Sequence, residues 1–229
     1  MDKYQLVKKI EDFAPLETAE DWDCSGWVVE TSSREIKRIM LALTITCDVI
    51  KQAKKQNCDM VISHHPLFSV PLSYKDIDLY CAHTNMDKAK GGTTDRLIES
   101  LGFSGIVSSG EFLRIVECDT TVEKFAVKLL KISPNMRFVN NRNAVGLKRI
   151  AFCSGSGSEF IPEAFEMGCD AMVTGDLKFH TALESPIVLF DIGHFESEIN
   201  VLDVFETLIS EGVEVIRAFE NSPFRQIKS

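Results

Sequence analysis

Short apolar runs alternate with longer amphipathic stretches along most of this chain, and this alternation constrains its fold more than any other feature. Apolar runs of about eight residues or fewer, followed by turn residues, predict strands that are buried on both faces of a sheet. The stretches between them have helical spacing. The chain is therefore predicted to be an α/β fold with a largely parallel sheet. The predicted strands are 39–43, 60–62, 79–82, 150–153, 171–173 and 187–190; the predicted helices are 47–56, 95–101, 123–130, 159–167 and 196–210.

The middle of the chain, residues 112–144, follows neither pattern clearly. We therefore predict two α/β lobes that meet near residues 105–115. The first lobe, residues 1–110, carries a His-His motif and a His-Asp motif, and the second, residues 111–229, carries a Thr-Gly-Asp motif and a Gly-His-Glu motif. The two lobes can be interlinked. Thr120 and Glu123 form a predicted capping box for the helix that begins near residue 123.

The composition excludes several classes of function. Its 25 Lys and Arg residues against 34 Asp and Glu residues give a net charge of −9, and an acidic chain without a basic cluster is not expected to bind a nucleic-acid polymer. It has no apolar stretch of the ~18 residues that a membrane span needs and no secretory signal. Seven scattered cysteines without a Cys-x-x-Cys pair are expected to be reduced, which predicts a cytoplasmic protein.

The five histidines are the most informative residues: His64, His65, His83, His180 and His194. The His64-His65 pair, His83 and His194 lie at the exits of three predicted strands, and His180 comes a few residues after a fourth. Ligands of open parallel sheets bind beyond the carboxyl ends of the strands. The histidines are therefore expected at a ligand site, although a single histidine such as His180 is more often an ordinary polar residue.

Spacing adds two carboxylates to this set. Asp87 follows His83 by four residues, and Glu198 follows His194 by four, so that on a helical turn each pair shares a face. Three imidazoles with two carboxylates suit zinc, iron, manganese or nickel better than calcium. For His83, and for Asp176 near the end of another predicted strand, the favoured role is to orient metal ligands through hydrogen bonds.

Four motifs occur in one order: Ile-Ser-His-His-Pro-Leu-Phe (62–68), Ala-His-Thr-Asn-Met-Asp (82–87), Thr-Gly-Asp-Leu-Lys-Phe-His (174–180) and Asp-Ile-Gly-His-Phe-Glu-Ser-Glu (191–198). Through them the chain resembles the Nif-three-like family of dinuclear metal centre proteins, also called GTP cyclohydrolase 1 type 2 homologs. The likeness covers almost the whole chain.

The resemblance implies a two-lobed fold with mostly parallel sheets flanked by helices and a metal site at the strand carboxyl ends. It also implies a homohexamer with two divalent metal ions per subunit, zinc, iron or manganese. Catalytic proton donors would be His83 and His180. The implied metal ligands are His64, His65, Asp87, His194 and Glu198.

Three positions depart from the family pattern. The family usually has Asn where this chain has Cys24, Asp where it has Thr44, and Thr where it has Ser197, which keeps the hydroxyl. The change at Thr44 removes a carboxylate, whereas the five ligand positions are intact.

The resemblance implies a dinuclear metal-dependent hydrolase of a small molecule, a purine nucleotide such as GTP, whose ring opens with release of formate. Two ions can activate water near neutral pH and polarise a carbonyl or phosphoryl oxygen. One alternative is a metal-binding, metal-delivery or adaptor protein without turnover, and another is a hydrolase of a different phosphoester or amide. The Gly/Ser loop 154–158 is a candidate anion site, but such loops are more often tight connections.

Overall fold

The computed structural model describes residues 1–67 and 69–225. Phe68, the last residue of the His-His motif, lies outside the described residues. The described residues form two compact units: the first unit comprises residues 1–67, 69–92 and 201–221, and the second unit comprises residues 93–200 and 222–225.

These units differ from the predicted lobes in two places. Residues 93–110 make their contacts within the second unit, and residues 201–221 return to the first. The first difference arises because helix α4 (Thr93–Ser100) contributes Leu97 and Ile98 to the core of the second unit. The second arises because β11 (Glu214–Arg217) pairs in parallel with β2 (Arg38–Thr44) of the first unit.

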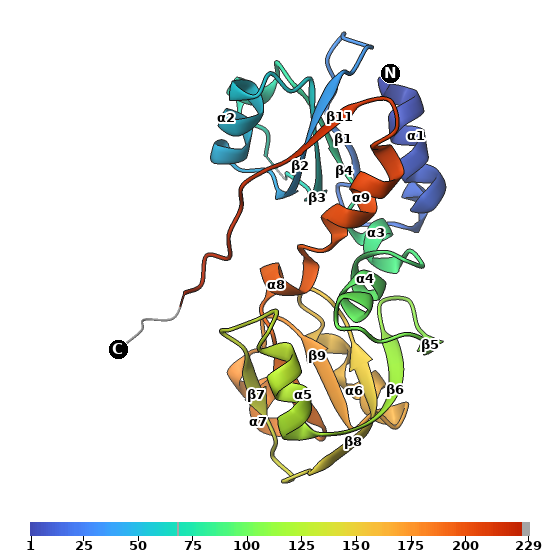
Figure 1. Ribbon diagram of the computed structural model, residues 1–229, viewed down its shortest axis with the longest axis vertical. Helices are drawn as coiled ribbons and strands as arrows, with labels where there is room; N and C mark the ends of the chain where they lie inside the picture. Colours follow the sequence, from blue (N-terminus) through green and yellow to red (C-terminus); the bar gives the residue numbers. More distant parts are fainter. Residues whose placement is uncertain (68, 226–229) are drawn as a thin grey trace. The chain divides into compact units, whose positions relative to one another are not determined.

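The first unit holds a five-stranded sheet in the order β1-β4-β3-β2-β11. Its central pairings are parallel, and β1 joins one edge antiparallel. Figure 1 shows α2 on one side of this sheet, and α1 with α9 on the other. The elements are α1 (Lys3–Phe13), η1 (Leu16–Thr18), β1 (Gly26–Val29), β2 (Arg38–Thr44), α2 (Cys47–Lys55), β3 (Met60–His65), η2 (Leu72–Tyr74), β4 (Asp78–Cys81), α3 (Thr84–Lys88), α9 (Val201–Ile209) and β11.

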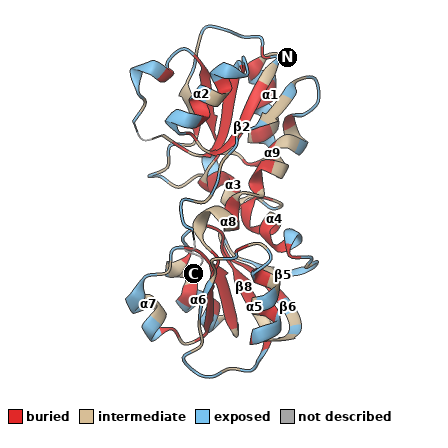
Figure 2. Ribbon diagram, turned by 60° about the vertical axis from the view of Figure 1, so that its left-hand side comes forward, coloured by how far each residue is buried: buried red, intermediate tan, exposed pale blue. Residues whose placement is uncertain are grey.

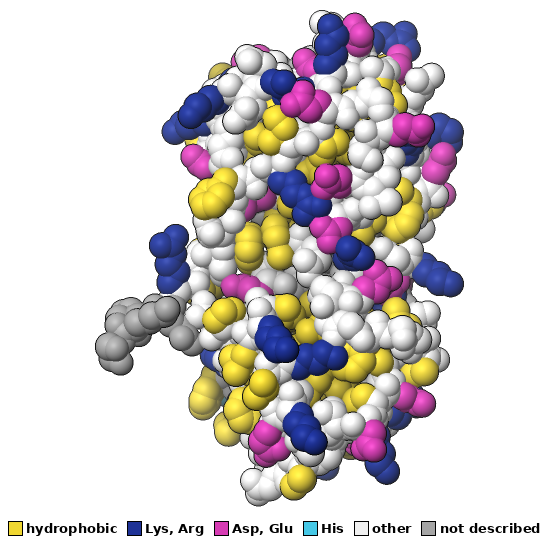
Figure 3. Space-filling model, viewed as in Figure 1, with side chains coloured by type: hydrophobic (Ala, Val, Ile, Leu, Met, Phe, Trp, Pro, Cys, Tyr) yellow, Lys and Arg dark blue, Asp and Glu magenta, His cyan; other side chains and the backbone are white. Residues whose placement is uncertain are grey.

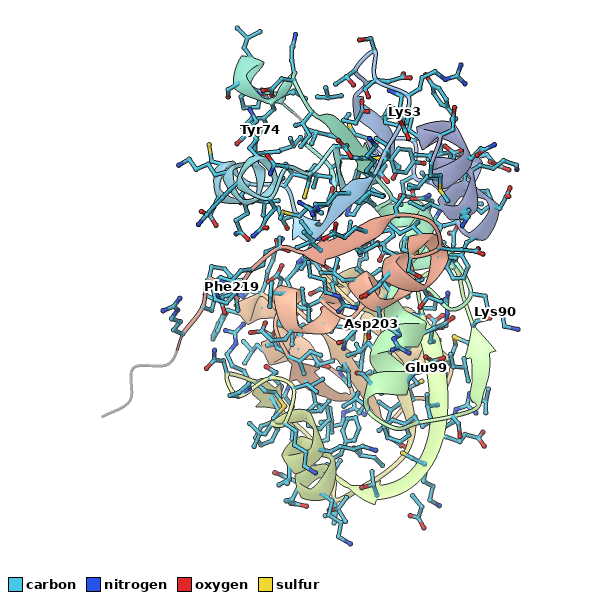
Figure 4. The ribbon with its side chains drawn as sticks, turned by 45° about the horizontal axis from the view of Figure 1, so that its top comes forward. Lys3, Tyr74, Lys90, Glu99, Asp203 and Phe219 are labelled. Atoms are coloured by element: carbon cyan, nitrogen blue, oxygen red, sulfur yellow. The ribbon has the colours of Figure 1, made fainter. Side chains whose placement is uncertain are left out.

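A buried lysine ties α1 to the strand that precedes His83. Lys3, labelled in Figure 4, is fully buried, and its Nζ lies 2.7 Å from the Thr31 carbonyl oxygen and 3.2 Å from Oδ1 of Asp78 at the start of β4. A buried charge is tolerated when it is paired and hydrogen-bonded in this way. This pair fixes the beginning of β4.

The second unit holds a six-stranded sheet in the order β5-β6-β8-β9-β10-β7. The pairs β8-β9 and β9-β10 are parallel, whereas β5-β6, β6-β8 and β10-β7 are antiparallel. Its elements are α4, β5 (Ile106–Ser109), β6 (Arg114–Thr121), α5 (Val122–Leu129), β7 (Arg137–Val139), β8 (Gly146–Phe152), η3 (Ser158–Phe160), α6 (Ile161–Glu166), β9 (Ala171–Thr174), α7 (Phe179–Glu184), β10 (Val188–Asp191) and α8 (His194–Glu198).

The α/β fold class is confirmed: two sheets are flanked by helices, and Figure 2 shows their central strands buried. The largely parallel arrangement holds for the first sheet, while the second is mixed. Two local details differ from the prediction. The predicted helix 196–210 is divided into α8 and α9, and the N-cap of α5 is Thr121 rather than Thr120, because the Thr121 hydroxyl accepts the hydrogen bond from the Lys124 amide.

Among residues 1–67 and 69–225, no helix is long and apolar enough to cross a membrane. Basic and acidic side chains are interspersed on the face drawn in Figure 3.

Candidate metal centre

His64 and His65 end β3 with their rings side by side, the ring centroids 5.0 Å apart. His64 is fully buried, and its Nδ1 lies 3.0 Å from the carbonyl oxygen of Ala82, the residue that follows β4. A carbonyl oxygen can only accept, so Nδ1 carries the proton and Nε2 keeps a lone pair. The pairing of β3 with β4 therefore fixes the tautomer in which Nε2 of His64 can bind a metal.

Thr44 contacts the ring of His65. It ends β2 directly opposite His65 in the parallel ladder, and its Oγ1 lies 2.6 Å from Nδ1 of His65. A hydroxyl can donate or accept a hydrogen bond, so Thr44 positions the Nδ1 edge of the ring without fixing its tautomer. Thr44 stands where the resembling family usually has a carboxylate, so this departure removes a negative charge.

His83 is oriented by a buried carboxylate. Its Nδ1 lies 2.9 Å from Oδ1 of Asp23. Burial works against the charge of Asp23, but hydrogen bonds from His83, Thr84 and Ser25 outweigh it and hold the pKa of Asp23 well below its usual range. Asp23 therefore remains ionised and fixes the proton of His83 on Nδ1.

Asp87 lies on α3, four residues after His83. Its Oδ1 is 3.4 Å from Nε2 of His64, and ring nitrogens of His64, His65 and His83 lie within 4.8 Å of one another. The first unit thus brings three imidazoles and one carboxylate together.

In the second unit, His194 and Glu198 lie one turn apart on α8, with Nε2 and Oε2 separated by 3.1 Å. Nδ1 of His194 lies 2.7 Å from Oδ2 of Asp176. Burial of the ring opposes its charge, but the hydrogen bonds and charges of Glu198 and Asp176 outweigh this effect and raise the pKa of His194 to about 9. Without a metal, a proton therefore occupies the place that a cation would take.

The Thr-Gly-Asp motif has a steric explanation. A side chain on Gly175 would collide with the backbone of His194 and of Gly155, so only glycine fits. Asp176 follows with a left-handed backbone, φ 56°, which aspartate tolerates better than most residues. This turn carries the Asp176 carboxylate to His194, as the expected orienting role requires.

Sequence reasoning missed the role of Gly155. Its φ is +67°, and a Cβ there would overlap Oε1 of Glu198. Its amide donates to Oγ of Ser197 at 2.9 Å, while that hydroxyl donates to the His194 carbonyl oxygen at 2.7 Å. Both contacts are made by the Ser197 hydroxyl, a group that the threonine usual at this position in the resembling family also has. The positive φ of Gly155 cannot be read from the sequence. Two glycines in a Ser/Gly loop do, however, indicate that the backbone of the loop approaches a neighbouring segment closely.

The same contacts decide between the two interpretations of loop 154–158. The Gly155 amide is bound to Ser197, and the Gly157 amide lies 2.8 Å from Oγ1 of Thr174. These amides stabilise the connection from β8 to η3, so the loop is a tight connection that supports the α8 residues.

His180 lies on the exposed surface of α7, with its ring 5.4 Å from that of Phe179. Its predicted role as a proton donor remains a prediction. Cys24, the remaining departure from the resembling family, is exposed.

The four remaining histidines share one arrangement: in each, an oxygen lies within hydrogen-bond distance of Nδ1. Metal-binding histidines are held in this way by neighbouring oxygens, and a nitrogen and carboxylate donor set suits borderline divalent cations. The residues present therefore fit a divalent metal. That His64, His65, Asp87, His194 and Glu198 hold the same two ions remains a prediction.

Known proteins resemble this chain along most of its length. The model of the family Duf34/NIF3 (NGG1p interacting factor 3) matches residues 1–223. A GTP cyclohydrolase 1 type 2 homolog of Clostridium perfringens is 34% identical, over 97% of this chain and 98% of the relative. A protein of the same description from Clostridium acetobutylicum is 32% identical over 84% of each chain.

Solved structures share the fold. Reduced HcgD from Methanocaldococcus jannaschii superposes with a TM-score of 0.82 at 28% identity, covering 95% of this chain and 97% of that one. The protein ybgI, of unknown function, gives a TM-score of 0.88 at 21% identity, covering 98% and 100% of the two chains; this second likeness concerns the fold alone.

Proposed function

This chain belongs to the DUF34/NIF3 family, and from that premise we propose that it is a metal-dependent hydrolase of a purine nucleotide, which opens the ring of GTP and releases formate. The observation that carries the proposal is the shared orientation of His64, His65 and His194, whose Nδ1 atoms are all engaged by oxygen. The names of the curated relatives supply the substrate class.

The proposed ligands of the two divalent ions, zinc, iron or manganese, are His64, His65 and Asp87 in the first unit and His194 and Glu198 in the second. When bound, such ions would activate water and polarise a carbonyl or phosphoryl oxygen. Asp176 and Thr44 hold the ligand rings in their orientation. Asp23 holds a proton on Nδ1 of His83, so His83 acts through Nε2, whether on a proton or on an ion.

A cavity of about 290 Å³ in the second unit borders the Asp176–His194 pair and supports a substrate with a polar heterocycle. Its lining includes one basic residue, Arg137, three acidic residues, Asp176, Asp191 and Glu196, and Phe224. Arg137 is paired with Asp191. Carboxylates accept hydrogen bonds from the N–H groups of guanine, and aromatic rings stack on nucleobases. We place the base of the proposed nucleotide in this cavity.

The test is a nucleotide panel. Wild type loaded with zinc, iron or manganese is incubated with GTP, ATP and simple phosphoesters, and formate and phosphate are measured. Formate from GTP with wild type, and its loss in Glu198→Ala, supports the proposal. Absence of formate with a fully loaded protein contradicts it, and phosphate release alone favours the phosphoester alternative.

A metal-binding or metal-delivery protein without turnover is the second candidate. The favouring observation is that the amides of Gly155 and Gly157 bind inside the fold, so this loop does not form a cradle for a triphosphate. Tight metal retention in the nucleotide panel, without any product, would support it.

We further propose that the chain assembles into the homohexamer that the family resemblance implies, with a small molecule rather than a nucleic-acid polymer or a membrane as its partner. Light scattering at micromolar concentration tests the assembly: a mass of six chains is expected, and a monomer contradicts it.

A further inference from the structure

Two of the three carboxylates that line the cavity of about 290 Å³ in the second unit are already engaged. Asp191, at the end of β10, is paired with Arg137 and accepts a hydrogen bond from the Gly193 amide at 3.1 Å. Oδ2 of Asp176 lies 2.7 Å from Nδ1 of His194. A ligand in the cavity would have to compete with these contacts for either carboxylate.

Glu196 of α8 is the third carboxylate. Within residues 1–67 and 69–225, no group donates a hydrogen bond to it and no cation pairs with it. Its side chain is half-buried and turns back over Gly193, where a Cβ would overlap Oε2 of Glu196. Gly193 has a φ of +84° and also lines the cavity. The missing side chain at Gly193 therefore leaves room for the carboxylate at the cavity wall, where both of its oxygens can accept hydrogen bonds.

The cavity is also lined by an aromatic residue, Phe224. Its backbone is attached to the second unit, because Nδ2 of Asn135 donates a hydrogen bond to the Phe224 carbonyl oxygen at 3.1 Å. Phe224 is 71% exposed, so most of its ring surface is available to a ligand. Aromatic rings stack on nucleobases, and a carboxylate accepts hydrogen bonds from N–H groups at the edge of a base. Together, these two residues suit a flat heterocycle with adjacent N–H donors.

Guanine has such a pair of donors, whereas adenine does not. Guanine carries N1–H next to its exocyclic 2-amino group, so two N–H groups point in one direction. At the same edge adenine has an unprotonated N1, which would place a lone pair against a carboxylate. A carboxylate at this edge therefore distinguishes the two purines.

We infer that Glu196 is the residue that selects guanine over adenine, with one carboxylate oxygen accepting from N1–H and the other from the 2-amino group. The inference rests on the proposed function and deepens it, since it names the group that determines the specificity of the same cavity. Glu196 contacts the base and is separate from the proposed metal ligands. A site built to bind two N–H donors rejects a base that lacks them, because the carboxylate is then left unpaired.

The test measures the binding of three nucleotide analogues to the zinc-loaded, full-length chain. The 7-deaza forms of GTP, ATP and XTP keep the edge of the base that Glu196 is inferred to contact, but carbon replaces N7, so their five-membered ring cannot be hydrolysed to formate. Calorimetric titrations compare wild type, Glu196→Gln and Glu166→Gln. Glu166 is the matched control, because it is exposed at the end of α6. Circular dichroism and zinc content check the fold and the metal loading of each variant.

Wild type is expected to bind the guanine analogue at least about 100-fold more tightly than the adenine analogue. Glu196→Gln should weaken binding of the guanine analogue by roughly 10–100-fold. It should also strengthen binding of the xanthine analogue, because the glutamine N–H donates to the 2-carbonyl group that replaces the amine. Glu166→Gln should behave as wild type does. An unchanged guanine affinity in folded, zinc-loaded Glu196→Gln would overturn the inference, as would a wild type without preference for guanine.

Formate release from GTP tests the proposed function separately. A guanine preference that depends on Glu196, in a wild type that releases no formate, overturns only the proposed reaction. Formate release by wild type, together with wild-type guanine affinity in Glu196→Gln, overturns only the inference.

Discussion

Oδ2 of Asp176 lies 2.7 Å from Nδ1 of His194, and this contact determines which nitrogen of His194 faces Glu198. The carboxylate comes from a left-handed residue in the loop after β9, whereas the imidazole begins α8. The loop after β9 and the first turn of α8 therefore together position Nε2 of His194.

Asp176→Asn is expected to weaken metal binding by about 10–100-fold, because the amide no longer raises the basicity of His194. Competition with a chelator of known affinity measures the change. Asp119→Asn, an exposed residue in β6, is the control and should bind as wild type does. An Asp176→Asn protein with wild-type affinity would show that the contact does not act on the metal.

Gly155→Ala tests the close approach of the loop to Glu198. Any side chain at φ +67° is strained, and here the Cβ would also displace the Glu198 carboxylate. Gly168 is a matched control, since its φ is +73° and a methyl group at that position would have no neighbouring atom within 4 Å. Both variants should lose roughly 1–2 kcal/mol of stability from the backbone, measured by urea unfolding. Only Gly155→Ala should lose further stability and metal affinity; equal behaviour of the two would contradict the role of this close approach.

Metal affinity should fall as the pH is lowered. A cation must replace the proton on His194, whose pKa is raised to about 9 by Glu198 and Asp176, so below that pH the proton competes. Apparent affinity should decrease by about tenfold for each pH unit between 9 and 7 from this group. Calorimetric titration in buffers of different ionisation enthalpy should record proton release on binding. Constant affinity over this range would argue against His194 as a ligand.

Thr44→Val should weaken metal binding by about tenfold, because an isosteric methyl group leaves Nδ1 of His65 without its 2.6 Å hydroxyl contact. Thr44→Ser restores a hydroxyl and should recover most of the affinity. If Val and Ser behave alike, the hydroxyl has no role in orienting His65.

The sequence predicts those parts of the fold and site that depend on local pattern. Buried runs identify β2, β3, β4, β9 and β10, and β3 carries His64 and His65 at its end. Strand β6 was missed because only its first half is buried, so neither alternation nor a continuous apolar run marks it. Thr121 rather than Thr120 caps α5 because the strand continues one residue further than the helical pattern indicates.

The orienting contacts were harder to predict, since they join segments far apart in the chain. Asp23 and His83 are 60 residues apart, and Gly155 and Ser197 are 42 apart. No periodicity relates such pairs; only the pairing of strands and the course of loops brings them together. Asp176 was predicted as an orienting residue because its motif lies at a strand end.

The proposed binding of two divalent ions by His64, His65, Asp87, His194 and Glu198 is tested most directly by metal analysis of the purified protein. Two ions per chain are expected for wild type by mass spectrometry of the elements, with fewer in His64→Ala and in Glu198→Ala. A wild-type protein that takes up less than one ion per chain after exposure to zinc, iron and manganese, or variants with the same metal content as wild type, would contradict the account.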